Sequence, residues 1–274
     1  MPLPAPGADL LVLAGDIGSY QTNSQLQGDD FGLARFSPRH GWPTPVLYIP
    51  GNHEYDMRDF DATHERLREL CELLGITWLE REVITLRALL GDAAPADCPA
   101  VRFVGTTLWT DFDALGPTDA QAAQLTNALA AQLHARKKAF GAANYYLKKS
   151  GTTRGDAPML AEQVREQGLL CQAWLRAALA RPFDGSTVAI THFAPSLKSS
   201  DPRYGMTPGT AGFCNAIDDL LPQAQLWLHG HLHSPSDYWA GDCHVVANPL
   251  GYARKNEQSA FRPDFMVKLD VKKA

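Results

Sequence analysis

Leu228-His229-Gly230-His231-Leu232-His233 is the stretch that best indicates the fold of this chain. It continues an apolar run that begins at residue 226 and predicts a buried strand. His231 and His233 are two positions apart, so on an extended segment their side chains point to the same side. Gly230 lets the backbone come close to whatever the imidazoles bind. The stretch therefore predicts part of a metal cluster at a strand end, with two chance histidines in a surface loop as the alternative.

Three earlier segments repeat this arrangement of an apolar run followed at once by polar side chains. They are residues 10–14 before Gly15-Asp16, residues 45–49 before Gly51-Asn52-His53-Glu54, and residues 188–191 before His192. Because open α/β sheets bind ligands at the carboxyl ends of their strands, these side chains are expected to meet at one edge. Carboxylate, amide and imidazole groups suit a hydrolytic divalent ion. Taken singly, Asp16 also fits an ordinary turn, and His192 fits a hydrogen-bonded structural imidazole.

Composition limits the class of protein. The chain has 274 residues, which is enough for one large α/β domain or two small ones, and we favour one. Its formal net charge of −5 favours neither nucleic acid nor a membrane surface as a partner. Its five cysteines are scattered without a C-x-x-C pair, so we expect reduced thiols and a cytoplasmic protein. The first nine residues do not resemble a signal peptide, and no apolar stretch is long enough to span a bilayer.

Periodicity predicts alternating strands and helices, which is typical of layered α/β folds. Further strands are expected at residues 76–79, 82–86, 101–108, 187–191, 226–229, 244–247 and 265–271. A helix is expected over residues 59–75, with Asp59 or Asp61 as its cap and Gly75 at its end. Thr118 and Gln121 form a capping-box pattern that opens a helix to about residue 140, and a second helix follows over residues 158–181. Residues 144–156, with three cations, are expected to form a solvated loop rather than a substrate contact.

The order and form of these pieces resemble the calcineurin-like metallophosphoesterases of the bacterial type, whose signature is D-x-H, G-D, G-N-H-[DE], H and G-H-x-H. Four of the five pieces occur in order, and the resemblance covers the chain from Ala8 onward. The runs 105–110 and 248–252 also look like those of bacterial members. The resemblance implies a layered β-sandwich of mixed sheets flanked by helices, a four-layer fold. It further implies a single domain over residues 1–274, in which a helical segment at about 118–181 flanks the site.

The resemblance also implies a role for each motif residue. Asp16 would bridge two metal ions (Mn, Fe or Zn). Asn52, His192 and His231 would complete the site of one of these ions. His233 would belong to the other site, and His53 would act as general acid without binding metal. The ions would hold the phosphate of a mono- or diester and activate the water that attacks phosphorus. The expected substrate is a phosphorylated small molecule or a nucleotide rather than a protein.

This sequence departs from the family pattern in two places. No D-x-H occurs in residues 1–9, so the first strand of the fold is expected to be missing, and the second ion keeps only Asp16 and His233. Either the chain is an incomplete copy of a longer protein, or the short form works with one ion or binds ligand without efficient turnover. Exposed strand edges would then favour low stability or strand exchange. Ser19 replaces an Asp that orients the catalytic His in some phosphoprotein phosphatases, which argues against that activity.

Two arginines are the expected substrate contacts. Arg203 and Arg254 are the cations nearest to the motif segments, and guanidinium groups bind phosphate through paired hydrogen bonds. A solvated arginine is the alternative at either position. Glu54 is expected to have a structural role near His53. A nuclease is disfavoured because no basic stripe or stacking pattern accompanies the motifs, and no organic cofactor site is evident. The remaining histidines are interpreted as packing or surface residues.

Overall fold

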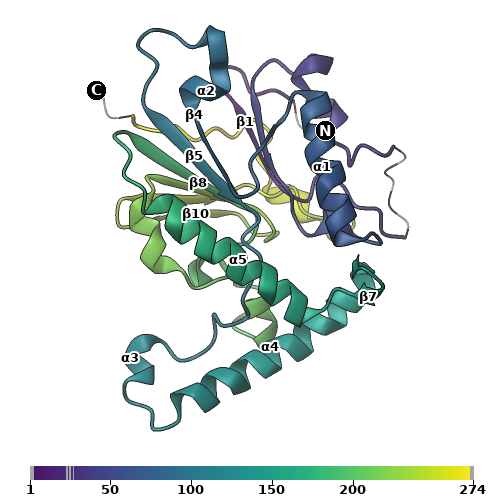
Figure 1. The fold of residues 1–274 in the computed structure, drawn as a ribbon, viewed down its shortest axis with the longest axis vertical. Helices are drawn as coiled ribbons and strands as arrows, with labels where there is room; N and C mark the ends of the chain where they lie inside the picture. Colours follow the sequence, from purple (N-terminus) through teal and green to yellow (C-terminus); the bar gives the residue numbers. More distant parts are fainter. Residues whose placement is uncertain (1–2, 23, 25, 27, 272–274) are drawn as a thin grey trace.

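The computed structural model describes residues 3–271 except residues 23, 25 and 27, and it contains two main sheets (Figure 1). The parallel sheet has the order β1 (Leu11–Ala14), β2 (Val46–Ile49) and β3 (Thr77–Trp78). The six-stranded sheet has the order β10 (Ser236–Ala240), β11 (Cys243–Ala247), β9 (Leu226–His229), β8 (Ser186–Thr191), β5 (Val101–Thr106) and β4 (Glu82–Thr85). Its central strands are parallel, and β4 and β10 pair antiparallel at the two edges. The sheet is therefore mixed, as predicted.

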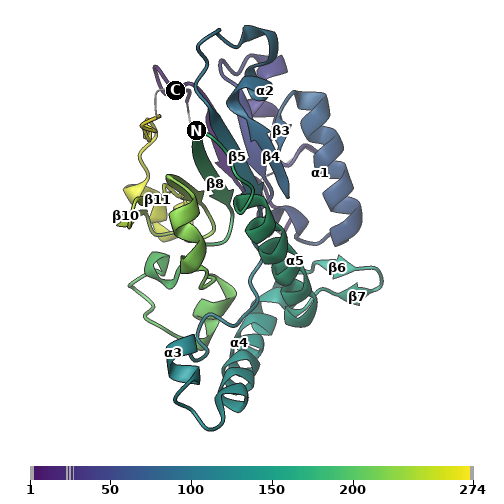
Figure 2. The same cartoon turned by 60° about the vertical axis from the view of Figure 1, so that its left-hand side comes forward.

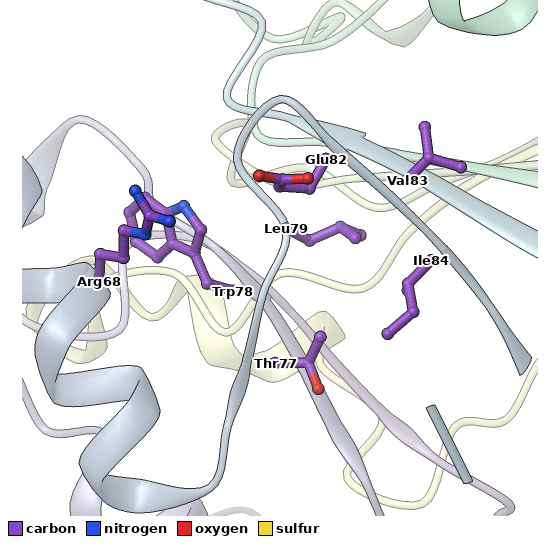
Figure 3. Close-up of a pocket in the computed structure, with 7 residues that line it drawn as sticks. All are labelled: Arg68, Thr77, Trp78, Leu79, Glu82, Val83 and Ile84. Carbon is purple, nitrogen blue, oxygen red and sulfur yellow. The ribbon is translucent and has the colours of Figure 1, made fainter. Parts of the chain in front are cut away.

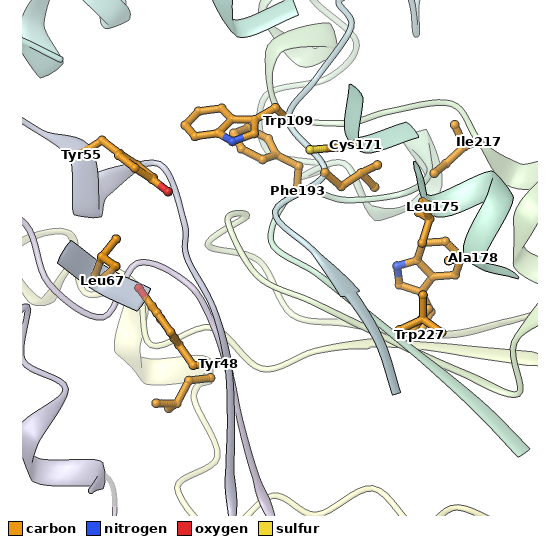
Figure 4. Packing of buried hydrophobic residues seen from close by; sticks show 14 of the residues in the cluster. Tyr48, Tyr55, Leu67, Trp109, Cys171, Leu175, Ala178, Phe193, Ile217 and Trp227 are labelled. Carbon is orange, nitrogen blue, oxygen red and sulfur yellow. The ribbon is translucent and has the colours of Figure 1, made fainter. Parts of the chain in front are cut away.

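The two sheets pack face to face through alternate residues of their strands. Leu47 and Ile49 of β2 share one buried cluster with Val188 and Ile190 of β8. The intervening residues point to the opposite faces, because successive side chains of a strand alternate. There Tyr48 packs with helix α1 (Phe60–Leu74), and the face of the larger sheet that carries Trp227 packs with helix α5 (Ala161–Leu179), as Figure 4 shows. Each sheet is thus covered by the other sheet and by a helix.

The ends of α1 follow the predicted chemistry. The Asp59 carboxylate accepts a hydrogen bond from the Ala62 amide at 3.0 Å, and Gly75 closes the helix at φ +69°. The other α-helices are α2 (Leu86–Leu90), α3 (Asp119–Ala122) and α4 (Ala128–Ser150). Short 3-10 turns lie at Ala34–Phe36, Pro38–His40, His53–Tyr55 (η3), Gly91–Ala93, Leu197–Ser199, Pro208–Gly212 (η6), Asp218–Gln223, Ala253–Lys255 (η8) and Glu257–Ala260 (η9). None of the described helices is both long and apolar enough to cross a bilayer.

The helical segment differs from its prediction. The capping box at Thr118 and Gln121 forms, with both of its hydrogen bonds present at 3.0 and 3.3 Å, but α3 ends at Ala122. A new helix, α4, then runs to Ser150, so the loop predicted for residues 144–156 is wrong over its first half. A small hairpin, β6 (Thr153–Arg154) and β7 (Ala157–Pro158), follows. Figure 1 and Figure 2 show that α3 and α4 project away from the two sheets.

Two strand predictions near the end of the chain also fail. Residues 265–271 form no strand, although the alternating Phe265, Val267 and Leu269 pack against the cluster between the sheets. The apolar side chains are buried by this packing. Among the described residues, however, no neighbouring strand pairs with the backbone of residues 265–271. Conversely, β10 was not predicted, because its sequence SDYWA lacks a clear apolar alternation and Trp239 on it is 66% exposed.

The sheet edges show where the candidate site does not lie. A cavity of about 230 Å³ opens between the edge strands β3 and β4, and Figure 3 shows its lining. It contains none of the residues that the motifs single out. β1 lies at an edge of its sheet, and no strand among the described residues pairs with its outer side. Strand exchange at this edge stays a prediction.

All five cysteines are free thiols, four of them buried.

Candidate functional site

Four strand ends bring the motif residues to one place. Asp16 follows β1, Asn52 lies just after β2, His192 follows β8, and His231 follows β9. One ligand atom each from Asp16, His192 and His231 lies within 4.8 Å of the others, a spacing that could hold one metal ion. The Nε2 atom of His192 is at the centre of this group. It lies 3.3 Å from Asp16 Oδ2, 3.1 Å from Asn52 Oδ1 and 3.2 Å from His231 Nδ1.

The loops approach closely because glycines occupy the points of contact. A Cβ added to Gly51 would collide with the Asp16 carboxylate, and one added to Gly230 would lie 2.5 Å from the Ala14 carbonyl oxygen. Asp16 and His231 themselves adopt positive φ angles of 56° and 62°. Non-glycine residues rarely adopt this conformation, and such strain is concentrated at functional sites. The surrounding contacts therefore hold both side chains toward the cluster.

Glu54 connects the first two loops. Its buried carboxylate accepts hydrogen bonds from the backbone amides of Asp16 at 3.1 Å, Ile17 at 2.7 Å and Gly51 at 2.8 Å. Burial and the negative charge of Asp16 raise its pKa to about 7. On the other side of the cluster, His192 Nδ1 lies 2.7 Å from the carbonyl oxygen of Ala14. That carbonyl can only accept, so Nδ1 carries the proton and donates it, and Nε2 faces the cluster.

The charges in the cluster suit a cation. Burial opposes ionisation of Asp16, but the nearby His192 and His53 outweigh it and hold the pKa of the carboxyl well below its usual range. Burial, reinforced by His192, keeps the pKa of His231 well below its usual value. His192 is also buried, yet the Asp16 carboxylate raises its pKa. Asp16 is thus ionised and His231 neutral, as metal ligands require, whereas the proton that Asp16 favours on His192 must leave when an ion binds.

His53 belongs to a separate hydrogen-bonded group. Its Nδ1 lies 2.6 Å from Asp56 Oδ2, and its Nε2 lies 3.2 Å from the hydroxyl of Tyr252. Burial lowers the pKa of His53, but the carboxylates of Asp16 and Asp56 raise it to about 9. Ser19, at the position where the resemblance expects an orienting Asp, donates to Asp56 Oδ2 at 2.7 Å. The orienting carboxylate therefore comes from Asp56, which directly follows turn η3 and lies three residues after His53. The sequence interpretation missed this residue.

His233 lies outside the three-residue cluster. Its Nδ1 is 2.7 Å from the buried carboxylate of Glu257, which also accepts from the Tyr252 amide at 2.9 Å. The two arginines differ. Arg203 is bound to Asp201 by paired hydrogen bonds of 2.9 and 2.6 Å. The guanidinium of Arg254 lies 5.1 Å from the ring centre of Tyr252, as does the amine of Lys255.

Comparison with solved structures identifies this architecture. The chain superposes on the phosphopantetheinyl hydrolase of Mycobacterium tuberculosis with a TM-score of 0.59 and 19% identity, over 90% of this chain and 80% of that one. This chain therefore has a metallophosphoesterase-like fold. A Staphylococcus aureus protein provisionally named a 5′-nucleotidase also matches, with a TM-score of 0.38 and 15% identity over 81% of this chain and 37% of that one. No protein-family model and no curated protein matches the sequence.

The residues present fit the ion that a metallophosphoesterase fold implies. The donor atoms are one carboxylate oxygen and two imidazole nitrogens, with the Asn52 amide oxygen alongside. His192 is fully buried, and its remaining nitrogen is fixed by a backbone carbonyl, which is how metal-ligating histidines are commonly oriented. This set suits a divalent transition metal better than Ca²⁺ or Mg²⁺, which prefer oxygen ligands alone. Among the described residues it is the one such group of three.

Proposed function

We propose that this chain is a metal-dependent hydrolase of phosphate mono- or diesters. One divalent ion, Mn, Fe or Zn, would be held by Asp16, Asn52, His192 and His231. The observation that carries the proposal is the convergence of Asp16, Asn52 and His231 on His192 Nε2, with the four residues supplied by four strand ends in two sheets. The metallophosphoesterase fold supports it independently.

The chain's own residues divide the chemistry between them. The ion, when bound, supplies Lewis-acid polarisation of the phosphate and of the attacking water. His53, with a pKa of about 9, is protonated at neutral pH and donates its proton to the departing alkoxide. Asp56 holds the imidazole by its Nδ1, which leaves Nε2, 3.2 Å from the Tyr252 hydroxyl, as the atom that would donate to the leaving group. Arg254 is proposed to neutralise phosphate charge in preference to Arg203, whose guanidinium already pairs with Asp201 and lies 3.9 Å from Glu257.

His233 is proposed as a ligand for a second ion, through the Nε2 atom that its contact with Glu257 leaves available. A single ion is the better supported state, because Asp16, His192 and His231 are the one group of three such ligands among the described residues, and His233 lies outside it. The same observation favours a second candidate function, in which the chain binds a metal or a phosphorylated ligand without efficient turnover.

One experiment separates the two functions. The purified protein is stripped with a chelator, reloaded with Mn²⁺, Fe²⁺ or Zn²⁺, and assayed for bound metal per chain and for hydrolysis of an aryl phosphate monoester and diester. We expect about one ion per chain and metal-dependent turnover, both lost in His231→Ala. The matched control is His244→Ala, which removes a histidine paired with Asp237 on the β10–β11 hairpin. Stoichiometric metal without turnover would favour the binding function, and turnover that survives His231→Ala would reveal a contaminating enzyme.

A further inference from the structure

Exposed aromatic rings continue outward from His231. The ring centre of Phe213 lies 5.4 Å from that of His231, and the ring centre of Tyr146 on α4 lies 6.3 Å from that of Phe213. These two side chains are 38% and 57% exposed. Three nearby apolar residues in the sequence are also exposed: Tyr145 on α4, and Tyr204 and Met206 in the loop before η6. Exposed apolar surface that adjoins a site commonly marks the place where a ligand binds.

The two rings stand on a packed base. Turn η6 packs directly against α4, so Phe213, which follows the turn, and Tyr146, on the helix, are held in fixed relation. Tyr145 differs from its neighbour. The amine of Lys149 lies 3.9 Å from the centre of its ring and donates to its hydroxyl at 2.7 Å. The ring of Tyr146 also packs edge to face with that of Tyr145, at 5.3 Å between centres, and Phe213 contacts both Tyr146 and His231. Phe213 and Tyr146 are therefore the exposed rings that connect α4 with the cluster.

We propose that Phe213 and Tyr146 form a subsite for a flat ring in the organic group of the substrate, which makes nucleotides the substrate class. This inference rests on the proposed function, because it places the phosphate at the Asp16 and His231 cluster. Phe213 packs against His231, so a ring bound beside Phe213 would lie next to a phosphate held at the cluster. Aromatic faces bind nucleobases by stacking without reading their identity. The subsite therefore distinguishes a nucleotide from an aliphatic phosphate, and not one base from another.

The test compares two phosphate monoesters that differ in the ring. Affinities for adenosine 5′-monophosphate and for glycerol 3-phosphate are measured by calorimetry in the presence of Mn²⁺, together with their rates of hydrolysis. Stacking on an aromatic side chain contributes on the order of tenfold in affinity, so the wild-type protein should prefer the nucleotide by about that factor. The preference should fall toward one in Tyr146→Ala and in the double variant with Phe213→Ala. Phe213→Ala could disturb His231, because the two rings are in contact. The single variant Tyr146→Ala controls for this effect, because Tyr146 contacts Phe213 and not His231.

Leu129→Ala is the matched control. Leu129 is an apolar residue of the same helix, 73% exposed and about 25 Å from Tyr146 along the axis. It should keep the wild-type preference. Equal affinity for the two esters, or a preference that survives the double variant, would overturn the inference. A phosphoserine peptide that competes as well as the nucleotide would overturn it too, by assigning the rings to a protein substrate. Ring preference without hydrolysis of either ester would refute the proposed function alone, and hydrolysis without ring preference would refute the subsite alone.

Discussion

At the residue scale, Asp56 acts on the proposed reaction through His53. Its carboxylate stabilises the protonated imidazole, so Asp56→Asn should lower the pKa of His53 from about 9 toward its ordinary value. A general acid works only while protonated, and the fall of kcat with rising pH should therefore begin at a lower pH in the variant. At alkaline pH we expect a loss of about a hundredfold with an alkyl phosphate and a smaller loss with a nitrophenyl phosphate, whose leaving group needs less protonation.

The measurement is a pH–rate profile for both esters, with bound metal determined in parallel. Ser19→Ala is the control, because it removes a hydrogen bond to Asp56 but leaves the carboxylate charge beside His53. It should move the alkaline limb much less. An unchanged limb in Asp56→Asn would show that His53 is not the proton donor, and a loss of metal would assign Asp56 to the structure of the cluster instead.

The same scale shows how far the sequence could predict the site. Asp16, Asn52, His192 and His231 were predictable because each follows an apolar run, and parallel strands bring their carboxyl ends to one edge. The partners that orient the imidazoles were not. Glu257 contacts His233 across 24 residues, and Tyr252 contacts His53 across 199. No local pattern encodes such pairs, because the packing of distant loops determines them.

At the element scale, His64 makes the stability of α1 depend on pH. Its imidazole lies among Tyr55, Phe60 and Trp78, with Nδ1 3.0 Å from the Tyr55 hydroxyl. Burial, and then the charge of Arg81, lower its pKa to about 4. The unfolded chain takes up this proton below about pH 6.5, whereas the folded chain does so only near pH 4. The free energy of unfolding should therefore decrease by on the order of 2–3 kcal/mol as the pH falls through that interval.

Urea unfolding at several pH values measures this dependence. His64→Gln should weaken it, because glutamine does not titrate and its amide can still contact the Tyr55 hydroxyl. Part of the slope should remain, because burial also lowers the pKa of His229 to about 4. His40→Gln, at an exposed position on the surface, should leave it as in the wild type. A slope in His64→Gln as steep as in the wild type would mean that His64 does not contribute to the acid sensitivity.

Elements were predictable where local chemistry decides them. The Asp59 cap and Gly75 terminate α1 at residues that the sequence indicates, and buried parallel strands such as β9 appear as short apolar runs. Tertiary contacts decided the rest. α4 extends to Ser150 through a polar, basic stretch, where its Asn144 carboxamide oxygen accepts from the Ala161 amide at the start of α5. Residues 265–271 have the alternation of a strand, but a strand also needs a neighbour for its backbone.

At the scale of the whole molecule, the candidate metal site joins the two sheets. Asp16 and Asn52 come from the parallel sheet, whereas His192 and His231 come from the six-stranded sheet. Other polar contacts between described residues also connect these ends: the Thr107 hydroxyl donates to the Pro50 carbonyl at 2.9 Å, and His192 Nδ1 donates to the Ala14 carbonyl at 2.7 Å. An ion at this site binds only the folded chain, because unfolding separates its ligands. Metal binding should consequently stabilise the entire fold rather than one loop.

Thermal unfolding with and without metal tests this coupling. An ion at a hundred times its dissociation constant adds about 2.7 kcal/mol to the free energy of unfolding, which for a chain of this size raises Tm by roughly 5 °C. Asp16→Asn and His231→Ala should abolish the shift, because each removes a donor from a different sheet. His244→Ala should retain it, since its histidine lies on the β10–β11 hairpin. An equal shift in the wild type and all three variants would place the ion elsewhere. A shift that is lost in His231→Ala but kept in Asp16→Asn would mean that the ion binds the six-stranded sheet without bridging to the parallel sheet.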